Sequence, residues 1–140
     1  MARLQATQSQ INLLARLMRA EAESDGNTGM LLVGMVGVNR VLAICDDFKN
    51  IYDIEDMVYQ SPGGFEAILY SYFYQAPREN EIKLAKRVIN GEQFDPGTDA
   101  LWFYDPGKPS CPATWWGQWN SGRYGDHCFF IPTTSQNCFN

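Results

Sequence analysis

Two glutamates at the end of the first helical segment differ in the surroundings that the sequence predicts for them. Apolar residues recur at helical spacing over residues 10–22, which predicts an amphipathic helix there. On a helical wheel of about 100° per residue, Glu21 falls beside Leu14 and Leu17 at the margin of the apolar stripe. Partial burial would raise the pKa of Glu21 and let its carboxyl donate a proton near neutral pH. Glu21 is therefore a candidate general acid, the alternative being an ordinary solvated glutamate in the last helical turn.

The second acid, Glu23, falls on the side of the wheel that carries Arg16 and Arg19. Arg19 and Glu23 are one helical turn apart and can form an ion pair, which would hold Glu23 ionised and outside the core. Glu21 has no such partner nearby in the sequence. We therefore expect the two acids to face different environments.

The single histidine, His127, is the next candidate for chemistry. It lies in the segment YGDHCF of residues 124–129, at the start of a predicted strand. Its ring could take part in catalysis, or it could simply bond a backbone carbonyl. A cysteine-nucleophile enzyme would pair it with a thiol, but no local signature marks a reactive cysteine. The chain also lacks the G-x-S-x-G elbow of serine hydrolases and the G-x-x-x-x-G-K-[ST] loop of nucleotide-binding proteins.

The C-terminal third combines aromatic rings with amide and acid side chains. All four tryptophans follow residue 100 and are interleaved with glycines. Aromatic faces stack on the apolar faces of sugar rings, while neighbouring amides and acids can bond the sugar hydroxyls. The sequence therefore predicts a carbohydrate-binding groove, although some of these rings would instead pack in the core and between strands. The set consists of Tyr104, Trp115, Trp116, Trp119, Gln118, Asn120 and Asp126.

The elements that must position these residues indicate one domain over residues 1–140. A chain of 140 residues with 45% hydrophobic residues fits a single folded core. After the first helix, capped by Ser9, a second helix over residues 30–42 is apolar on nearly every side and should lie in the middle of the domain. Gly34 and Gly37 would let another backbone approach it closely. The segment is too short and too interrupted to span a membrane.

Caps and turn residues mark the remaining helices and strands. Asp53 predicts the start of a short helix and Asn80 the start of a longer one. Residues 66–74 are dense in aromatic side chains and are expected to be helical. Short apolar runs bounded by Pro and Gly predict strands at residues 100–104 and 128–131. Helices that precede strands in this way are typical of α+β folds.

Charge and cysteine content narrow the class of protein further. Eleven Lys and Arg against sixteen Asp and Glu give a net charge of −5, so no general field collects phosphates and nucleic acid is not expected as a partner. The first ten residues lack the apolar run of a secretory signal peptide, so synthesis in the cytoplasm is expected.

The four scattered cysteines lack the close pairs of zinc sites, so we expect free thiols and no metal site. They are Cys45, Cys111, Cys128 and Cys138.

An ordered set of short segments extends over about residues 12–131. The first are LARLMRAEA (14–22), VGVNRV (36–41), YQ (59–60) and GF (64–65). They are followed by AKRVING (85–91), DP (95–96), ALWFYDP (100–106) and GDHCF (125–129). No single segment is specific, but the ordered set resembles the SleB/CwlJ family of spore cortex-lytic enzymes, and within it the CwlJ branch.

This resemblance implies a fold and a site. The expected fold is α+β and lysozyme-like, mostly helical with a small β element in the C-terminal third. The family's catalytic glutamate falls on Glu21. One departure is Asp105, where relatives commonly have Asn. The residues that the resemblance places along or behind the substrate groove are Asn39, Gln60, Phe65, Tyr104 and His127.

The resemblance also implies a biological setting. The substrate would be the β-1,4-linked glycan of the spore cortex, with its muramic δ-lactam, which is degraded when spores germinate. The CwlJ branch is associated with the spore coat and depends on the coat protein GerQ for its place there. No metal or other cofactor is implied, apart from activation by calcium dipicolinate.

The reaction type depends on the number of acids at the site. Hydrolysis needs a second carboxylate, about 6.5–9.5 Å away for inversion or about 5–5.5 Å away for retention, and the sequence offers none on the face of Glu21. A lytic transglycosylase needs one acid, which protonates the leaving oxygen and then takes the proton of the muramyl 6-hydroxyl to give a 1,6-anhydro product. We expect this reaction, with Glu23, Asp25 or Asp126 as the second acid if the products are hydrolytic. The alternatives are a non-catalytic glycan-binding or coat-assembly module cross-linked through its cysteines, and a thiol-dependent enzyme.

Overall fold

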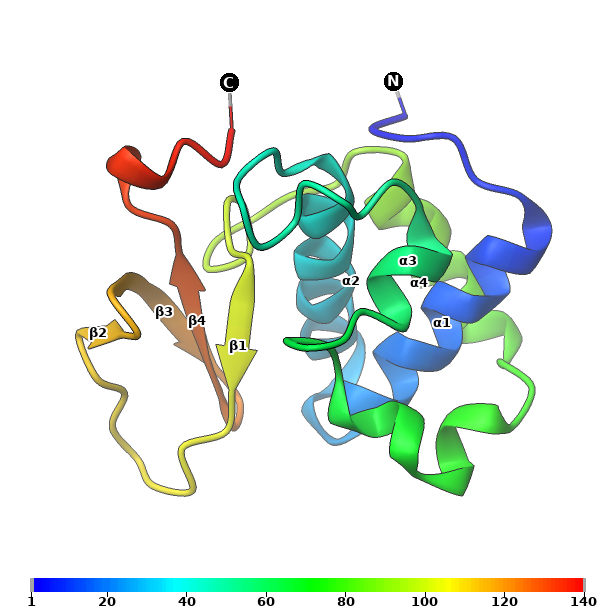
Figure 1. The fold of residues 1–140 in the computed structure, drawn as a ribbon. Coiled ribbons are helices and arrows are strands. Elements are labelled where there is room, and N and C mark those ends of the chain that lie inside the picture. The colour runs from blue at the N-terminus through cyan, green and yellow to red at the C-terminus, as the bar shows by residue number, and fades with distance from the viewer. Residues whose placement is uncertain (1, 140) are drawn as a thin grey trace.

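The computed structural model describes residues 2–139, which form a helical half and a β-sheet half (Figure 1). Three long helices, α1, α2 and α4, pack against one another, and their buried apolar side chains form most of the larger hydrophobic core. The helices are α1 (Gln8–Ala22), α2 (Gly26–Leu42), α3 (Ile54–Val58) and α4 (Glu79–Ile89), with short 3₁₀ helices η1 (Glu23–Asp25), η2 (Glu66–Leu69), η3 (Ser71–Tyr74) and η4 (Thr134–Gln136).

The first helix begins two residues earlier than expected, at Gln8. Its N-cap is Thr7, whose hydroxyl accepts a hydrogen bond from the Gln10 N–H (3.1 Å) while the Gln10 side chain accepts one from the Thr7 N–H (2.9 Å). This reciprocal pair satisfies two N–H groups that would otherwise be free at the helix start. Ser9 therefore lies inside α1, and the predicted Ser9 cap is wrong.

The second helix passes through the core, as its composition predicted. Every residue from Gly29 to Arg40 is buried. The helix begins at Gly26, four residues before the expected start. A Cβ atom at Gly34 or Gly37 would come within about 3 Å of methionine or valine side chains on the surrounding helices, so these glycines admit side chains rather than a neighbouring backbone. Within residues 2–139, no helix is long and apolar enough to cross a membrane.

Two of the other helical predictions are corrected and one is confirmed. Residues 66–74 form η2 and η3 instead of one helix, because Tyr70 between them has an extended backbone (φ −116°, ψ 146°). In α4 the N-cap position is Arg78, and Asn80 lies within the helix. The Asp53 cap of α3 is confirmed, since its carboxylate accepts a hydrogen bond from a backbone N–H of the first turn (2.8 Å).

The sheet consists of β1 (Trp102–Tyr104), β2 (Thr114–Trp115), β3 (Gln118–Tyr124) and β4 (His127–Ile131). Its strands are antiparallel and lie in the order β1-β4-β3-β2. β1 and β4 match the two predicted strands within two residues. The β2–β3 hairpin was not predicted, because its turn is a Trp-Gly pair instead of the Asn-Gly or Asp-Gly that typically marks a two-residue hairpin loop. The predicted α+β class, with helices first and a small sheet last, is confirmed.

All four cysteines are paired, as Cys45–Cys138 and Cys111–Cys128. The prediction of free thiols is therefore wrong. The partners are 93 and 17 residues apart in the sequence, so their spacing could not show the pairing. Beside the first disulfide, the Ile44 N–H donates a hydrogen bond to the Cys138 carbonyl (2.9 Å), which joins the C-terminal tail to the loop after α2. No thiol is left for a thiol-dependent reaction or for cross-linking, so both of those alternatives lose their chemical basis.

Candidate active site

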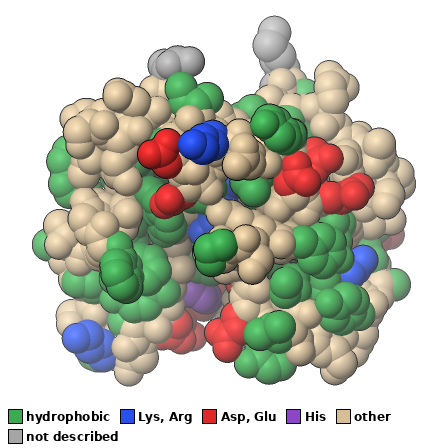
Figure 2. Space-filling model, in the orientation of Figure 1, with side chains coloured by type: hydrophobic (Ala, Val, Ile, Leu, Met, Phe, Trp, Pro, Cys, Tyr) green, Lys and Arg blue, Asp and Glu red, His purple; other side chains and the backbone are tan. Residues whose placement is uncertain are grey.

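Glu21, at the end of α1, lines a cavity of about 350 Å³ between the helical half and the sheet. Its walls come from segments that are far apart in the sequence, and its volume lies within the range of small-ligand sites. Figure 2 shows the hollow on this face, with hydrophobic side chains along both sides and acidic side chains near its lower end. The lining residues are Glu21, Arg40, Gly64, Phe65, Glu66, Phe103, Tyr104, Asp105 and His127.

The carboxyl of Glu21 has a strongly perturbed pKa. Burial raises it from 4.5 to about 7, because the charged form loses hydration. The electrostatic influence of His127 and Arg40 opposes this shift, and the neighbouring carboxylate of Glu66 adds to it. Glu21 is therefore substantially protonated near neutral pH, as its position on the helical wheel predicted.

Arg40 supplies a buried positive charge to the same cavity. Its side chain is only 4% exposed. It donates hydrogen bonds to the Leu101 carbonyl (2.8 Å), the Gly63 carbonyl (3.0 Å) and the Gln60 side chain (3.4 Å). Burial lowers the pKa of Arg40 to about 10, so the group stays charged at neutral pH. The sequence indicated Arg40 only as part of a motif, because no local pattern reveals that it lines the same cavity as Glu21.

His127 is held by Asp25, the last residue of η1. The ring Nδ1 lies 2.7 Å from the Asp25 carboxylate, and the two side chains are 14% and 5% exposed. The backbone N–H of Asp126 donates to the same carboxylate (3.3 Å). Gly125 is required at this turn, because a Cβ there would lie 2.3 Å from an Asp25 oxygen. His127 therefore bonds a carboxylate, so both the backbone-carbonyl and the cysteine-partner interpretations are wrong.

The contact between Asp25 and His127 also joins the two halves of the molecule. Asp25 follows the end of α1 by three residues, and His127 begins β4, 102 residues further along the chain. The ring of His127 also meets the Phe103 ring edge-on, with centroids 5.3 Å apart. The hydrogen bond between the two side chains thus ties the helix end that carries Glu21 to the facing sheet.

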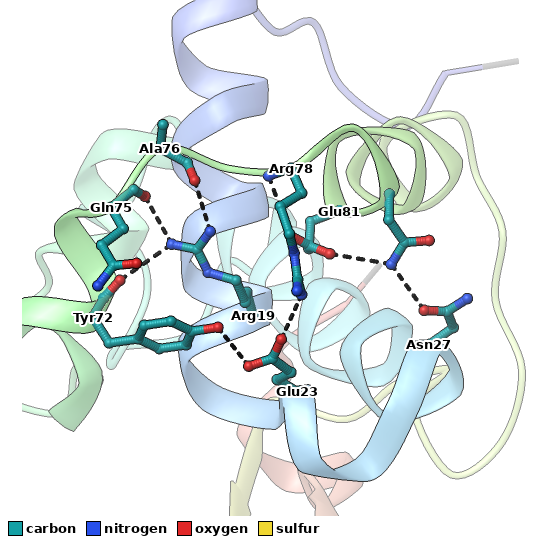
Figure 3. A network of polar contacts seen from close by, with 9 residues as sticks. Arg19, Glu23, Asn27, Tyr72, Gln75, Ala76, Arg78 and Glu81 are labelled. Atoms are coloured by element: carbon teal, nitrogen blue, oxygen red, sulfur yellow. Dashed lines mark hydrogen bonds and ion pairs between the residues drawn. The ribbon is translucent and has the colours of Figure 1, made fainter.

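Glu23 lies in a different environment from Glu21 (Figure 3). Its carboxylate accepts hydrogen bonds from the Tyr72 hydroxyl and the Arg78 guanidinium. The hydrogen bond from Tyr72 is the main cause of the lowered pKa of Glu23; burial opposes it, and Arg78 reinforces it. Arg78 also bonds the buried carboxylate of Glu81 (2.8 Å), so Glu23 belongs to a network of structural ion pairs.

The expected ion pair between Arg19 and Glu23 is absent from the described residues, and that prediction is wrong. Arg19 is 2% exposed and donates to three backbone carbonyls within residues 72–76, at 2.7–3.1 Å (Figure 3). Glu23 remains one helical turn from Arg19, since its backbone N–H donates to the Arg19 carbonyl, but the two side chains bond different partners.

The structure brings three of the five predicted groove residues to the cavity of Glu21. Phe65, Tyr104 and His127 line it directly. Gln60 lines a neighbouring cavity of about 680 Å³, which shares three lining residues with the first. Asn39 does not reach either cavity: it is fully buried and donates to backbone carbonyls of residues 97–100 at 2.8–3.3 Å, so it supports the chain that leads into β1.

The sequence reasoning gave no role at the site to two acids beside Glu21. Glu66 and Asp105 both line its cavity and both are exposed. Asp105 was noted only as a departure from the family pattern, and the only signal of Glu66 was its position directly after the motif residue Phe65. The acids named as possible second carboxylates are elsewhere: Glu23 and Asp25 are engaged by the partners described above, and none of Glu23, Asp25 and Asp126 lines the cavity.

The aromatic set divides between packing and exposure. The Tyr104 ring stacks on the Trp115 ring, with centroids 4.5 Å apart and planes 25° apart. Trp115 lines the larger cavity, so the stack connects the two cavities. Trp116 and Trp119 are 84% and 45% exposed, respectively. The predicted aromatic wall therefore exists on the sheet side of the hollow.

Known proteins resemble this chain in sequence and in fold. A family model described as Cell Wall Hydrolase matches residues 24–130. The chain is 56% identical over 135 residues to cell wall hydrolase CwlJ of Oceanobacillus iheyensis, covering 96% of this chain and 95% of that protein. It is 28% identical over 119 residues to the spore cortex-lytic enzyme of Bacillus subtilis, covering 85% of this chain and 36% of that protein.

The structural relatives include the catalytic domain of the germination-specific lytic transglycosylase SleB from Bacillus anthracis. It superimposes with a TM-score of 0.71 at 23% identity, covering 89% of this chain and 96% of that one. The fold predicted from the resemblance is therefore confirmed. The family model begins three residues after Glu21, so it does not bear on the acid itself. The extent of the family match and the 56% identity to CwlJ show that the chain belongs to the cell wall hydrolase family.

Proposed function

We propose that the protein is a cortex-lytic enzyme of spore germination that cleaves the β-1,4 glycan strand as a lytic transglycosylase, with Glu21 as its acid and base. The observation that carries the proposal is the carboxyl of Glu21, which has a pKa of about 7 and lines a cavity walled by aromatic rings. A protonated carboxyl at neutral pH is what departure of a sugar oxygen requires.

The reaction would proceed in two proton transfers. Glu21 first donates its proton to the glycosidic oxygen as the bond from that oxygen to C1 of the muramyl residue breaks. The carboxylate that remains then takes the proton of the muramyl 6-hydroxyl, whose oxygen bonds to C1 and closes the 1,6-anhydro ring. The substrate's acetamido group would assist at C1.

The surrounding charges suit a group that must alternate between these two states. Burial favours the neutral acid, while Arg40 and His127 favour the carboxylate, and the balance leaves the pKa of Glu21 about 7. A group with a pKa near the working pH can both give and take a proton. Asp25 would keep the His127 ring in place across the cavity from Glu21.

The relatives support the substrate and the timing. One relative is named a spore cortex-lytic enzyme, and the SleB domain with the same fold is described as a germination-specific lytic transglycosylase. These names are consistent with cortex peptidoglycan as the polymer and with 1,6-anhydro ends as the product.

Product analysis tests the proposal. Purified wild-type protein and Glu21→Gln should be incubated with cortex fragments, and the released muropeptides identified by mass spectrometry. We expect 1,6-anhydro ends from the wild type and almost no release by the variant. Reducing muramic ends would contradict transglycosylation and would make Glu66 or Asp105, which line the same cavity, the candidate activator of water.

The family resemblance extends the proposal to the place of action. We propose that the protein acts in the spore coat, depends on GerQ to be placed there, and is activated by calcium dipicolinate. Fluorescently tagged protein should lose its coat localisation in spores that lack GerQ. Release of muropeptides from decoated spores, measured with and without calcium dipicolinate, tests activation separately.

A further inference from the structure

A tight turn at the tip of the β2–β3 hairpin holds a tryptophan in an unfavourable backbone conformation. Trp115 and Gln118 are paired across the hairpin, so Trp116 and Gly117 form a two-residue loop. Their φ angles are 53° and 84°. Positive φ at both positions is the geometry of a type I′ turn, which favours Asn or Gly at the first position.

Packing does not explain why a tryptophan stands there. Trp116 is 84% exposed, the most exposed of the large hydrophobic side chains. A bulky residue with positive φ is strained, and its backbone cost is not offset by burial at this position. Asn at the same place would suit the turn better and would leave no large apolar ring in water. Local stability therefore does not explain why residue 116 is a tryptophan.

Trp116 directly follows a residue that lines the larger cavity. Tyr104 lines the cavity of Glu21 and stacks on Trp115, which lines the larger cavity. Trp116 follows Trp115 directly at the tip of the hairpin. The stacked rings of Tyr104 and Trp115 thus reach from the cavity of Glu21 into the larger cavity, and the exposed tip of the hairpin begins at the next residue.

We propose that Trp116 is an outlying binding site for the glycan strand, where its ring stacks on a sugar beyond the two cavities. The identity of the ligand rests on the proposed function. An exposed rigid ring offers a face to any sugar of a long strand at little cost in side-chain freedom. The contact would hold the enzyme on an insoluble polymer. It would contribute little to the binding of short substrates that fill only the cavities.

Binding to purified cortex tests this site apart from cleavage. The measurement uses Glu21→Gln protein, which should bind without digesting, and compares it with Glu21→Gln carrying Trp116→Asn or Trp116→Gly. Both replacements suit the positive φ of the turn, and both remove the ring. The matched control is Tyr52→Ala in the same background, because Tyr52 is also a strongly exposed aromatic residue (76%) but belongs to the segment before α3 and lines neither cavity.

We expect the Trp116 variants to bind cortex about 3- to 10-fold more weakly, while their melting temperature is equal to or above that of the parent. Tyr52→Ala should bind like the parent. In an active Glu21 background, Trp116→Asn should raise KM more for long strands than for a tetrasaccharide. Unchanged binding to cortex, or equal losses on long and short substrates, would overturn the proposal. If the wild type does not cleave cortex, the proposed function is contradicted. Product analysis gives that result, whereas the binding measurement tests Trp116 separately.

Discussion

The two acids at the end of α1 are of the same residue type and only two residues apart, yet their environments are opposite. Glu21 faces an aromatic cavity, where burial raises its pKa to about 7. Glu23 faces a network of donors, where Tyr72 and Arg78 lower its pKa. A separation of two residues places the two side chains on different sides of the helix end. The surroundings of each carboxylate therefore decide whether it can act as an acid.

The two regions also differ in what holds them together. Around Glu23, charges are matched by hydrogen bonds, including a buried Glu81 that accepts from Arg78 and Asn80. Around Glu21, the side chains of Arg40 and His127 bond other partners and only influence the carboxyl through space. The first arrangement is typical of structural ion pairs, and the second leaves a carboxyl free to meet a substrate.

The largest expected effect is on catalysis. Glu21→Gln keeps the shape of the side chain but removes the acidic proton of the carboxyl. Cleavage of cortex fragments should therefore fall about 10²- to 10⁴-fold. Glu23→Gln is the matched control, and it should keep activity within a few-fold. Both rates are measured by muropeptide release under single-turnover conditions. Equal losses in the two variants would remove the functional distinction between the acids.

The next effect is on stability, in the region of Glu23. Arg19→Met should lower the free energy of unfolding by about 3 kcal/mol, because three backbone carbonyls would lose their buried donor. The exposed Lys83, with 72% of its side chain accessible, provides the control Lys83→Met, which should change stability little. Urea titration of both variants measures the difference. A stability loss below about 1 kcal/mol for Arg19→Met would show that the network is not structural.

A third prediction concerns pH. Because the pKa of Glu21 in the folded state is raised from 4.5 to about 7, the folded protein loses stability as pH rises through this interval. Glu21→Gln removes that cost, so it should match the wild type at pH 4 and be more stable by roughly 1–3 kcal/mol at pH 8. Unfolding curves of both proteins across this range provide the measurement. An equal difference at both pH values would contradict a raised pKa.

The smallest of the four effects concerns the support of His127. Asp25→Asn keeps the size of the side chain but removes the charge that holds the ring (2.7 Å). We expect a loss of about 10-fold in kcat with KM nearly unchanged, because the cavity walls remain. Asp126→Asn, one residue from His127 but outside the cavity, is the control. A pure KM effect would indicate that the pair shapes the groove without serving the reaction.

Helical periodicity was enough to indicate that Glu21 is partly buried with a raised pKa, but not what surrounds it. The placement of Glu21 depends on residues within two turns of α1, so a wheel could show it. Arg40, Glu66 and Asp105 arrive from three other segments, and His127 meets Asp25 across 102 residues of sequence. Such encounters depend on tertiary packing, which no local pattern records.

The errors at element ends have a similar origin. The reciprocal cap at Thr7 replaced the predicted cap at Ser9 because the Gln10 side chain was available to complete it. The predicted Arg19–Glu23 pair does not form because Arg19 bonds backbone carbonyls of residues 72–76, while Glu23 accepts from Tyr72 and Arg78. The disulfide between Cys45 and Cys138 closes across 93 residues, which spacing could not indicate.

The central claim is that Glu21 holds a proton at neutral pH, and its titration tests that claim most directly. Protein carrying ¹³C-labelled glutamate carboxyls can be followed by NMR from pH 3 to pH 9, with Glu21→Gln identifying the resonance. The account predicts a midpoint of about 7 for Glu21. A midpoint near 4.5, the value of an ordinary glutamate, would contradict it.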